Sequence, residues 1–501
     1  MEYYIIHSNS DSYIYDIHAL FSAFYPGVEV KVLTPSSAVV KNREIQKAKT
    51  RATLFFDPSF VECAFEEEEE KGTPAKTYHW ECSGVPEAAF KNGLKRFLYD
   101  SLSERTGKKL PWGDLTGIRP TKIAMTMLAD GKGEDEIRNF LQGAHAVTTE
   151  KTELSIDIAK REGALIRDIE KKVQEGKPCY SLYLGVAFCP TTCLYCSFPS
   201  YPVAVYKDRL DAYVDRLLRE CEQAVSFYPG ITPDTIYIGG GTPTSLSAEQ
   251  LKRLTDGIAS LVDVSKLKEY TVEAGRPDSV STDKFKVLKE ARVTRISINP
   301  QTMKQQTLDI IGRLHTVEDT VKAFEAAREA GFDNINMDTI LGLPGETPAD
   351  VEKTFRRIEE LAPDSVTVHS LAVKKGSRLS DRIREQSIEM PSADQMGESM
   401  EIASAAMKRM GLDPYYLYRQ KHMTGNLENV GYAKSGKEGL YNILIMEEVE
   451  SIVACGAGTI SKRVFPGGRI ERCENVKEIS EYLTRLDEMM ERKAKLFINC
   501  R

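Results

Sequence analysis

Three cysteines lie within eight residues of this chain, at Cys189, Cys193 and Cys196. Thiolates that are so close in sequence converge on one soft metal centre more easily than scattered ones do. Closed zinc and iron-sulfur sites normally use four protein ligands, so a set of three indicates a centre with one coordination position open for a substrate or cofactor. The spacing by itself leaves two kinds of centre open: an iron-sulfur cluster, or a zinc ion completed by a distant histidine.

A disulfide framework is excluded by composition. The chain has 10 cysteines in 501 residues, which is too sparse for a disulfide scaffold. The sequence begins Met-Glu-Tyr-Tyr and shows no basic region of the secretory kind. We therefore expect a cytoplasmic protein with reduced thiols, in which the cysteines outside the loop are small buried or surface residues.

Length and charge exclude further classes. A chain of 501 residues, 41% hydrophobic and 28% charged, is typical of a soluble globular protein with two to four domains. No apolar stretch reaches the roughly 18 residues that span a membrane. The net charge of -7 gives no support for nucleic-acid binding, which usually needs a basic face. We expect neither a membrane span nor a nucleic-acid partner.

Strands and helices alternate regularly after Cys179. Strands are predicted at residues 181–186, 235–238, 269–273, 295–299, 334–341 and 364–371, with helices such as 206–227, 248–261 and 317–330 between them. Repeated strand–helix units predict a parallel sheet, either an open doubly wound sheet or a full or partial (β/α) barrel. In both, chemistry gathers at the C-terminal ends of the strands. The cysteine loop follows the first of these strands directly.

A second motif, Gly-Gly-Gly-Thr-Pro-Thr at residues 239–244, follows the second strand. Three glycines remove every Cβ and so let a ligand lie against the backbone. The run lacks the Lys-Ser/Thr ending of a phosphate-binding P-loop. Taken alone, it is equally compatible with a tight turn between barrel elements.

Together the two motifs resemble the radical S-adenosylmethionine (SAM) superfamily. That superfamily has a Cys-x3-Cys-x2-Cys loop after the first strand of a partial (β/α)6 barrel, with an aromatic residue before the last cysteine, here Tyr195. The resemblance implies that Cys189, Cys193 and Cys196 bind a 4Fe-4S cluster whose fourth iron is chelated by SAM. One electron from the reduced cluster would then cleave SAM to methionine and a 5'-deoxyadenosyl radical.

Further segments are similar to the oxygen-independent coproporphyrinogen III oxidases, also called coproporphyrinogen dehydrogenases. These segments contain Tyr183, Gly239 to Thr244, Glu273 in Val-Glu-Ala-Gly-Arg-Pro, Gln301 in Ile-Ser-Ile-Asn-Pro-Gln, Arg313 in Ile-Gly-Arg-Leu-His, and Asp338 in Asp-Thr-Ile-Leu-Gly-Leu-Pro-Gly-Glu. The passage Trp-Gly-Asp-Leu-Thr-Gly-Ile-Arg-Pro at residues 112–120 resembles the family's longer branch, which carries an N-terminal extension.

The resemblance implies a set of SAM contacts. Gly240, Gly241 and Thr242 would hold the methionine end, and the other contacts would be Tyr183, Tyr195, Glu273, Gln301, Arg313 and Asp338. The ammonium, carboxylate, sulfonium and ribose hydroxyls of SAM suit acidic, amide and basic partners. Taken alone, a carboxylate at a strand end could equally cap a helix or pair with a cation.

The chain departs from the family pattern at two places. The family's Tyr-x-His before the cluster reads Tyr183-Leu-Gly185, and its Glu-x-Asn-Pro motif reads Glu273-Ala-Gly-Arg276-Pro277. We expect SAM cleavage to survive both changes. The histidines that could face the barrel interior are His315, His369 and His422, of which His369 is best placed, and no catalytic acid or base is assigned.

The predicted fold is α/β: a partial (β/α)6 radical SAM barrel with an N-terminal α+β domain and a small C-terminal region. The predicted domains are residues 1–121 (α+β), 122–177 (helical connector), 178–385 (barrel) and 386–501 (C-terminal region covering the barrel). Within the first domain, strands are expected at residues 3–7, 28–33, 53–56 and 60–65, followed by a helix at about 86–105.

The function that the resemblance implies is oxidative decarboxylation of two propionates of coproporphyrinogen III, which yields protoporphyrinogen IX in anaerobic haem biosynthesis. A tetrapyrrole substrate and a reducing donor such as flavodoxin or ferredoxin are then the expected partners. Two alternatives stay open: a radical SAM enzyme acting on haem or another tetrapyrrole, and a haem-binding chaperone. Chaperones of this family show His-Asn-x-x-Tyr-Trp. The nearest stretch here, Glu428-Asn429-Val-Gly-Tyr432-Ala433, lacks the histidine and the tryptophan, which favours an enzyme.

Overall fold

The computed structural model describes residues 3–37, 49–67, 72–117, 119–373, 377–385, 388–420 and 427–498. The chain divides into two compact units, one of Met1–Asp157 with Arg419–Leu427 and one of Ile158–Tyr418 with Glu428–Arg501. The predicted domain bounds stay predictions. None of the helices in the described ranges combines the length and the apolar character that a membrane crossing requires.

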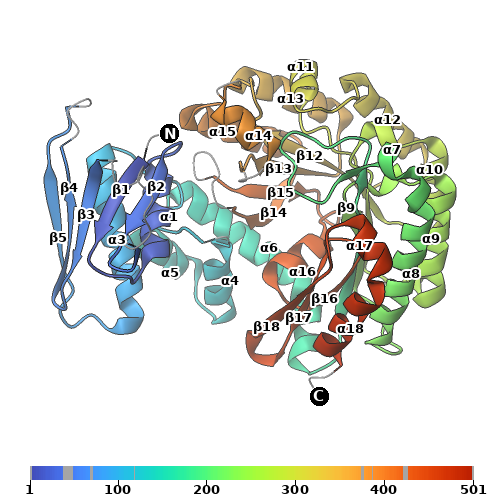
Figure 1. Cartoon of the computed structure of the whole chain (residues 1–501), viewed down its shortest axis with the longest axis horizontal. Coiled ribbons are helices and arrows are strands. Elements are labelled where there is room, and N and C mark those ends of the chain that lie inside the picture. Colours follow the sequence, from blue (N-terminus) through green and yellow to red (C-terminus); the bar gives the residue numbers. More distant parts are fainter. Residues whose placement is uncertain are drawn as a thin grey trace. The chain divides into compact units, whose positions relative to one another are not determined.

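The first unit contains a five-stranded sheet in the order β2-β1-β3-β4-β5 (Figure 1, blue). β1 is parallel to β2 and β3, whereas β3, β4 and β5 are antiparallel neighbours. The elements are β1 (Tyr3–Ser8), α1 (Ile14–Phe24), β2 (Glu29–Leu33), β3 (Thr50–Phe56), β4 (Phe60–Phe65), β5 (Lys76–Glu81) and α3 (Glu87–Thr106). The N-terminal α+β prediction is confirmed; the sequence reading missed β5, whose mostly exposed residues lack the expected apolar alternation.

A turn-rich passage follows α3, as the glycines and prolines of the sequence predict. Trp112 is fully buried, and Gly113 has φ +54°. A Cβ on Gly113 would lie 1.8 Å from the carbonyl oxygen of His145, so only glycine allows the backbone to approach so closely. The helices after this turn are α4 (Thr121–Ala129), α5 (Glu134–Asn139), the π-helix η3 (Phe140–Ala144) and α6 (Thr149–Gln174).

Six parallel strands form the centre of the second unit, in the spatial order β6-β9-β10-β11-β12-β13. They are β6 (Tyr180–Val186), β9 (Thr235–Gly240), β10 (Glu269–Glu273), β11 (Arg295–Ser297), β12 (Ile335–Leu341) and β13 (Ser365–Ser370). All six predicted strands are present and in sequence order, which is the partial (β/α)6 arrangement that the sequence predicted.

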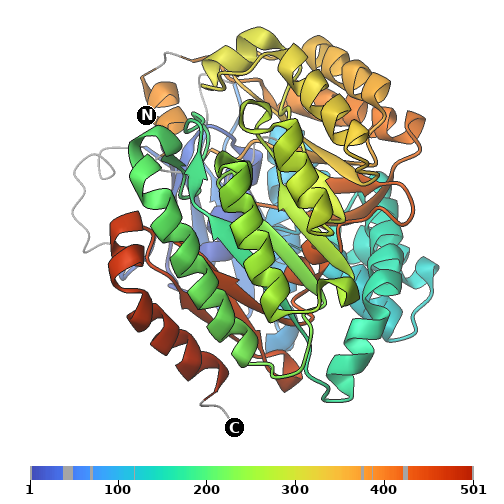
Figure 2. The same ribbon diagram turned by 90° about the vertical axis from the view of Figure 1, so that its right-hand side faces the viewer.

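Helices follow the strands along the outside of this sheet (Figure 1). They are α8 (Leu210–Ser226), α9 (Ala248–Leu261), α10 (Thr282–Glu290), α11 (Gln305–Ile310), α12 (Val317–Glu329) and α13 (Pro348–Leu361). In Figure 2, α8, α9 and α10 lie side by side in green to yellow-green. Capping boxes at Ser247, Thr316 and Thr347 explain where α9, α12 and α13 begin, because each hydroxyl accepts a hydrogen bond from the third helical amide.

The two faces of the strands differ in chemistry. In β6, Leu182, Leu184 and Val186 are buried, and the residues between them point to the opposite face. On that inner face the ring of Tyr183 stacks on the ring of Tyr237 from β9, with centroids 6.0 Å apart. The inner face is therefore polar and aromatic, and it is the face that can receive a ligand.

The C-terminal segment extends the sheet at both edges, giving eleven strands in the described residues. β14 (Asp413–Tyr418) and β15 (Asn429–Ala433) join beside β13, and β16 (Ser451–Cys455), β17 (Ile460–Val464) and β18 (Ile470–Glu474) join beside β6. The remaining elements are α14 (Arg378–Arg384), α15 (Ala393–Arg409), α16 (Leu440–Glu447), α17 (Ile479–Thr484) and α18 (Leu486–Phe497).

Helix α16 lies at the inner face. The carboxylate of Glu269 in β10 accepts hydrogen bonds from the backbone amides of Leu440 and Tyr441, at 2.6 and 3.2 Å. This caps the positive end of the helix. The ring of Tyr441 then stacks on Tyr237 and Tyr183, at 4.5 and 6.0 Å between centroids.

A buried carboxylate fixes the turn between β16 and β17. Glu220 of α8 accepts hydrogen bonds from the Gly456 amide, the Asn475 side chain and the Tyr482 hydroxyl, each at 2.7 Å, and pairs with Lys493. This ion pair is fully buried, so removing either partner would leave an uncompensated charge. The turn that it holds packs against β6.

Gly185, where the family carries a histidine, lies under this turn. A Cβ on Gly185 would lie 2.4 Å from Cγ2 of Thr459, and its other neighbours would be at 3.5 Å. The Thr459 hydroxyl is fixed by a 2.8 Å hydrogen bond to the Gly456 carbonyl. The methyl group of Thr459 therefore occupies the place of a side chain at position 185.

This contact predicts a coupling between the two positions. We expect Gly185→Ala to lower the free energy of unfolding by about 1–3 kcal/mol through overpacking. Thr459→Ser removes the methyl and keeps the hydroxyl, so the double variant should be more stable than the sum of the single changes predicts. Urea unfolding monitored by circular dichroism measures these values.

The matched control is Gly397→Ala in α15, where a Cβ meets nothing within 4 Å. It should stabilise the chain by about 0.5–1 kcal/mol. Strictly additive effects of Gly185→Ala and Thr459→Ser would contradict the proposed contact.

Candidate functional site

The cysteine loop between β6 and α8 has little regular structure, and hydrogen bonds to neighbouring segments hold it. It contains β7 (Phe188–Cys189) and β8 (Tyr201–Pro202), which pair with each other, and α7 (Val203–Tyr206) follows. The Leu194 amide donates to the Ile311 carbonyl at 2.9 Å, and the Thr191 hydroxyl donates to the Gly312 carbonyl at 3.0 Å. The loop is thus tied to the segment that follows β11.

The glycine turn after β9 is bonded to the same loop. The amides of Gly241 and Thr242 donate to the carbonyls of Val186 and Phe188, both at 2.7 Å. A Cβ on Gly241 would lie 2.6 Å from the Phe188 oxygen, so glycine is required there by the close approach of two backbones. These two amides are therefore committed within the protein, and the turn can offer a ligand carbonyl oxygens, such as those that accept from an ammonium group.

The three thiols have different surroundings. Cys189 is buried, and its sulfur lies 3.3 Å from the Thr242 hydroxyl, which joins the cysteine loop to the glycine turn. Burial raises the pKa of the Cys189 thiol to about 11 while the contact with Thr242 opposes the shift. The Ser200 hydroxyl donates to the Cys196 sulfur at 4.0 Å. The buried thiol of Cys189 needs a cation or a metal centre nearby to exist as a thiolate.

Two carboxyl groups lie on the inner face, at Glu273 and Asp338. The Tyr237 hydroxyl donates to Glu273 at 2.6 Å, yet burial dominates and raises the pKa of Glu273 to about 7. Burial also raises the pKa of Asp338, but the nearby His369 imidazole and the hydrogen bond from the Asn336 side chain, at 2.7 Å, more than offset it and hold the pKa below its usual value. The site thus contains one carboxyl that titrates near neutrality and one that stays ionised.

Gln301 and Arg313 carry polar atoms without partners. Gln301 has φ +66°, a conformation that costs a non-glycine residue energy and is often kept at functional sites. Its Oε1 is buried and has no hydrogen-bond partner among the described residues. Arg313 is 2% exposed; its Nη2 donates to the Gly275 carbonyl at 2.7 Å, and its Nε lacks a partner in the same part of the chain. A buried guanidinium without a bonded carboxylate suits an anionic ligand group.

The two tyrosines that the sequence predicted as SAM contacts have different surroundings. Tyr183 lies on the inner face, where its ring stacks on the rings of Tyr237 and Tyr441, with centroids 6.0 Å apart in both pairs. Tyr195 is half-buried in the cysteine loop, where burial and the neighbouring Cys193 raise its pKa well above the usual value. Both hydroxyls stay protonated near neutral pH, because burial raises the pKa of Tyr183 as well.

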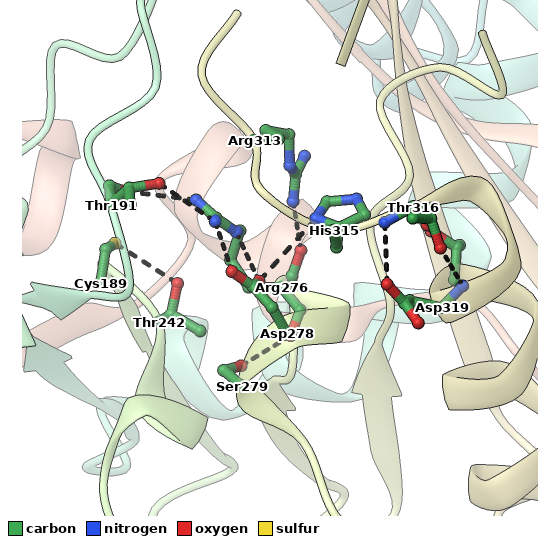
Figure 3. Close-up of polar contacts among 12 residues, drawn as sticks. Cys189, Thr191, Thr242, Arg276, Asp278, Ser279, Arg313, His315, Thr316 and Asp319 are labelled. Carbon is green, nitrogen blue, oxygen red and sulfur yellow. Dashed lines mark hydrogen bonds and ion pairs between the residues drawn. The ribbon is translucent and has the colours of Figure 1, made fainter. Parts of the chain in front are cut away.

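The sequence reading missed the residues that link β10 to the cysteine loop. Arg276 donates to the backbone carbonyl and the hydroxyl of Thr191, at 3.2 and 3.1 Å (Figure 3). Its Nη1 also lies 3.7 Å from the Cys193 sulfur. Asp278 accepts from the same guanidinium at 2.9 and 2.7 Å. The sequence contained one sign of this link. The segment Gly-Arg-Pro differs from the family's Glu-x-Asn-Pro motif, and the difference introduces an arginine next to the site.

The predicted histidines have separate surroundings. His369 lies on the inner face, with Nε2 3.9 Å from Asp338 and Nδ1 3.4 Å from the Tyr418 hydroxyl. His315 is buried next to Asp278, at 3.8 Å, and burial lowers its pKa to about 4, so it is neutral at physiological pH (Figure 3). His422 lies outside the described residues.

The spacing of the three sulfurs bears on the choice of metal centre. Two thiolates on one zinc ion can be at most about 4.6 Å apart, since each Zn–S bond is about 2.3 Å. The described residues contain one group of His, Cys, Asp or Glu ligand atoms that all lie within 4.8 Å of one another, and it is not the cysteine loop. A larger centre, such as a cluster with irons at separate corners, fits this spacing better than one ion.

That compact group is Cys179, Asp234 and Glu450, which precede three neighbouring parallel strands. It lies at the N-terminal strand ends, opposite to the cysteine loop. Lys172 and Lys268 already pair with Asp234 at 2.9 and 3.2 Å. We read it as an ion-paired structural cluster, because two ammonium groups compensate the charge that would otherwise attract a metal ion.

The raised pKa of Glu273 predicts a pH-dependent stability. Because its pKa in the folded protein, about 7, lies above the ordinary value of 4.5, Glu273 stabilises the fold fully below pH 4.5 and loses this contribution as the pH rises to about 7. The difference in unfolding free energy between the wild type and Glu273→Gln should therefore fall over this range, by up to about 3 kcal/mol. Urea titrations at several pH values measure it, with the exposed Glu249→Gln as control. A difference that rises with pH would contradict the assignment.

Comparisons with known proteins agree with this geometry. The model of the radical SAM superfamily matches residues 183–358, which run from the first strand through α13. The solved structure of coproporphyrinogen III oxidase (HemN) from Escherichia coli has the same fold, with a TM-score of 0.51 and 21% identity over 64% of this chain and 72% of that one.

Two curated proteins of Bacillus subtilis (strain 168) are also similar. The heme chaperone HemW is 34% identical over 60% of this chain and 75% of its own length. The oxygen-independent coproporphyrinogen-III oxidase-like protein HemZ is 37% identical over 437 residues, which cover 85% of this chain and 86% of HemZ. The chain therefore belongs to the HemN-related family of radical SAM proteins, whose cofactors are a 4Fe-4S cluster and SAM.

Proposed function

We propose that this protein is a radical SAM enzyme that oxidatively decarboxylates coproporphyrinogen III to protoporphyrinogen IX. The observation that carries the proposal is the set of three thiols after β6, together with the buried Arg313 and Gln301, whose Nε and Oε1 have no partner among the described residues. The relation to HemZ and the fold shared with HemN support the tetrapyrrole as substrate.

In this proposal Cys189, Cys193 and Cys196 hold the cluster and leave its fourth iron for SAM. When bound, the cluster and SAM supply one-electron chemistry that removes a hydrogen atom from the substrate. Each propionate loses that hydrogen from its β-carbon, then carbon dioxide, and then one electron to an acceptor, which leaves a vinyl group. The residues of this chain orient the reactants and keep water away from them.

The charges of the assigned residues indicate which group of SAM each of them would bind. Arg313 would bind the SAM carboxylate, and carbonyl oxygens of Gly240 and Gly241 would accept from its ammonium group. Thr242 would hold the methionine end together with these two glycines. The contacts to the remaining groups of SAM, such as its ribose hydroxyls, are assigned to Glu273, Gln301 and Asp338, and Tyr183 and Tyr195 would help to shape its surroundings. The unpartnered Oε1 of Gln301 and Nε of Arg313 support these roles, because a ligand would satisfy atoms that are otherwise buried alone.

A haem chaperone is the second candidate, because the chain is 34% identical to HemW over 60% of its length. The stretch nearest to the chaperone motif forms β15, between β13 and β14. There Asn429 accepts from the Ser370 amide at 2.9 Å, and Glu428 and Tyr432 are buried. The Asn429 side chain thus bonds within the sheet, which supports an enzyme. A flavodoxin or ferredoxin donor and a cytoplasmic location stay predictions.

The proposal predicts that activity needs both the cluster and the tetrapyrrole. We expect the anaerobically reconstituted protein, given SAM, dithionite and coproporphyrinogen III, to form 5'-deoxyadenosine and protoporphyrinogen IX, both measured by mass spectrometry. A Cys189→Ala, Cys193→Ala, Cys196→Ala variant should lose the cluster and both products, whereas Cys473→Ala in β18 should keep them.

Two results would each contradict a different part of the proposed function. If deoxyadenosine forms at the same rate without a tetrapyrrole and no vinyl product appears, the substrate is wrong and SAM cleavage stands. If the purified protein holds zinc and cleaves no SAM, the whole assignment fails. Stable haem binding without substrate-dependent SAM cleavage would favour the chaperone.

A further prediction concerns Arg313. Arg313→Gln removes a charge-assisted hydrogen bond worth about 1.5–3 kcal/mol, so the affinity of the cluster-loaded protein for SAM should fall about tenfold or more. Equilibrium dialysis with labelled SAM measures the change. The control is Arg409→Gln, at an exposed position of α15 that pairs with Glu359. Equal affinity in both variants would exclude Arg313 as the carboxylate partner.

A further inference from the structure

All five N–H groups of Arg276 have acceptors, and these hold its guanidinium against the cysteine loop. Nε and one Nη2 proton go to Asp278, the second Nη2 proton goes to the Thr191 hydroxyl, and Nη1 serves the Thr191 carbonyl and the Cys193 sulfur. The residue is 4% exposed. A planar guanidinium is suited to such a fixed, multiply bonded place, whereas a lysine offers three donors from one point.

The contact with Cys193 has an electrostatic consequence. Hydrogen bonds to ligand sulfurs and nearby net charge are two of the factors that set the reduction potential of an iron-sulfur cluster. The reduced cluster carries one more negative charge than the oxidised one. A buried positive charge whose Nη1 lies 3.7 Å from the sulfur therefore favours the reduced state, because little water screens it.

Asp278 acts in the opposite sense. Its carboxylate accepts from Nε and Nη2 of the guanidinium, at 2.9 and 2.7 Å (Figure 3), whereas Nη1 makes the contact with Cys193. It fixes the orientation of Arg276 and at the same time cancels part of its charge. The two residues should thus shift a cluster potential in opposite directions, although both stabilise the same loop.

We propose that Arg276 is a positioning residue that raises the reduction potential of the cluster through its hydrogen bond to Cys193, with Asp278 moderating the effect. This inference rests on the assignment of Cys189, Cys193 and Cys196 as cluster ligands in the proposed function, but it is independent of the substrate. It gives a role to the arginine in the segment Glu273-Ala-Gly-Arg276-Pro277, which stands here in place of the family's Glu-x-Asn-Pro motif.

The test is a redox titration of the reconstituted full-length protein without SAM, with the reduced cluster followed by electron paramagnetic resonance. In Arg276→Gln the equilibrium constant for reduction should fall on the order of tenfold, which is 59 mV for one electron. Arg276→Lys, which keeps the charge, should lie nearer to the wild type. Asp278→Asn should shift the potential upward, and the exposed Arg409→Gln should not shift it.

Opposite shifts in Arg276→Gln and Asp278→Asn support the proposal, because a purely structural role would move both in the same direction or neither. An unchanged potential in Arg276→Gln overturns it. If Arg276→Gln does not retain a cluster, Asp278→Asn decides: an unchanged or lower potential overturns the proposal. A cluster retained in the triple cysteine variant overturns the ligand assignment as well, whereas a missing vinyl product leaves this inference standing.

Discussion

The structure depends on the bonding of an irregular loop to the ends of neighbouring strands. A centre with only three protein ligands requires that its thiols be held by something other than the metal. Here the glycine turn supplies two backbone hydrogen bonds of 2.7 Å to residues 186 and 188, and the segment after β11 supplies another to Leu194. The contact is so close that a Cβ at Gly241 would lie 2.6 Å from a carbonyl oxygen. The glycine run therefore serves first to bring the second strand end against the cysteine loop.

The inner face of the sheet combines this loop with polar groups from the other strands. Parallel strands end at one edge, so Glu273, Gln301 and Asp338 converge there although they are far apart in sequence. Burial then separates the chemistry of the two carboxyls, with the pKa of one raised to about 7 and that of the other lowered by its hydrogen bonds. Helix α16 and its tyrosine complete this face from the C-terminal segment.

At both places where the sequence departs from the family pattern, the structure shows a contact that accompanies the change. At Gly185 the methyl of Thr459 takes the space of a side chain, so the loss of an imidazole is matched by a larger residue on the adjoining turn. Within the altered motif, the guanidinium of Arg276 reaches both the backbone and a sulfur of the cysteine loop.

The sequence by itself determined the six central strands and the motifs at their ends, because apolar runs and the spacing of cysteines and glycines are local properties. The order of the strands in a partial barrel followed only from the family resemblance. The sequence also placed Cys189, Cys193 and Cys196 after the first strand. It missed β5, whose exposed edge carries no apolar pattern, and the strands of the C-terminal segment. Only the tertiary structure decided that Arg276 meets Cys193, 83 residues away, and that Thr459 fills the space at Gly185. These contacts depend on which side chains the folded strands bring together, and no periodicity along the chain records that.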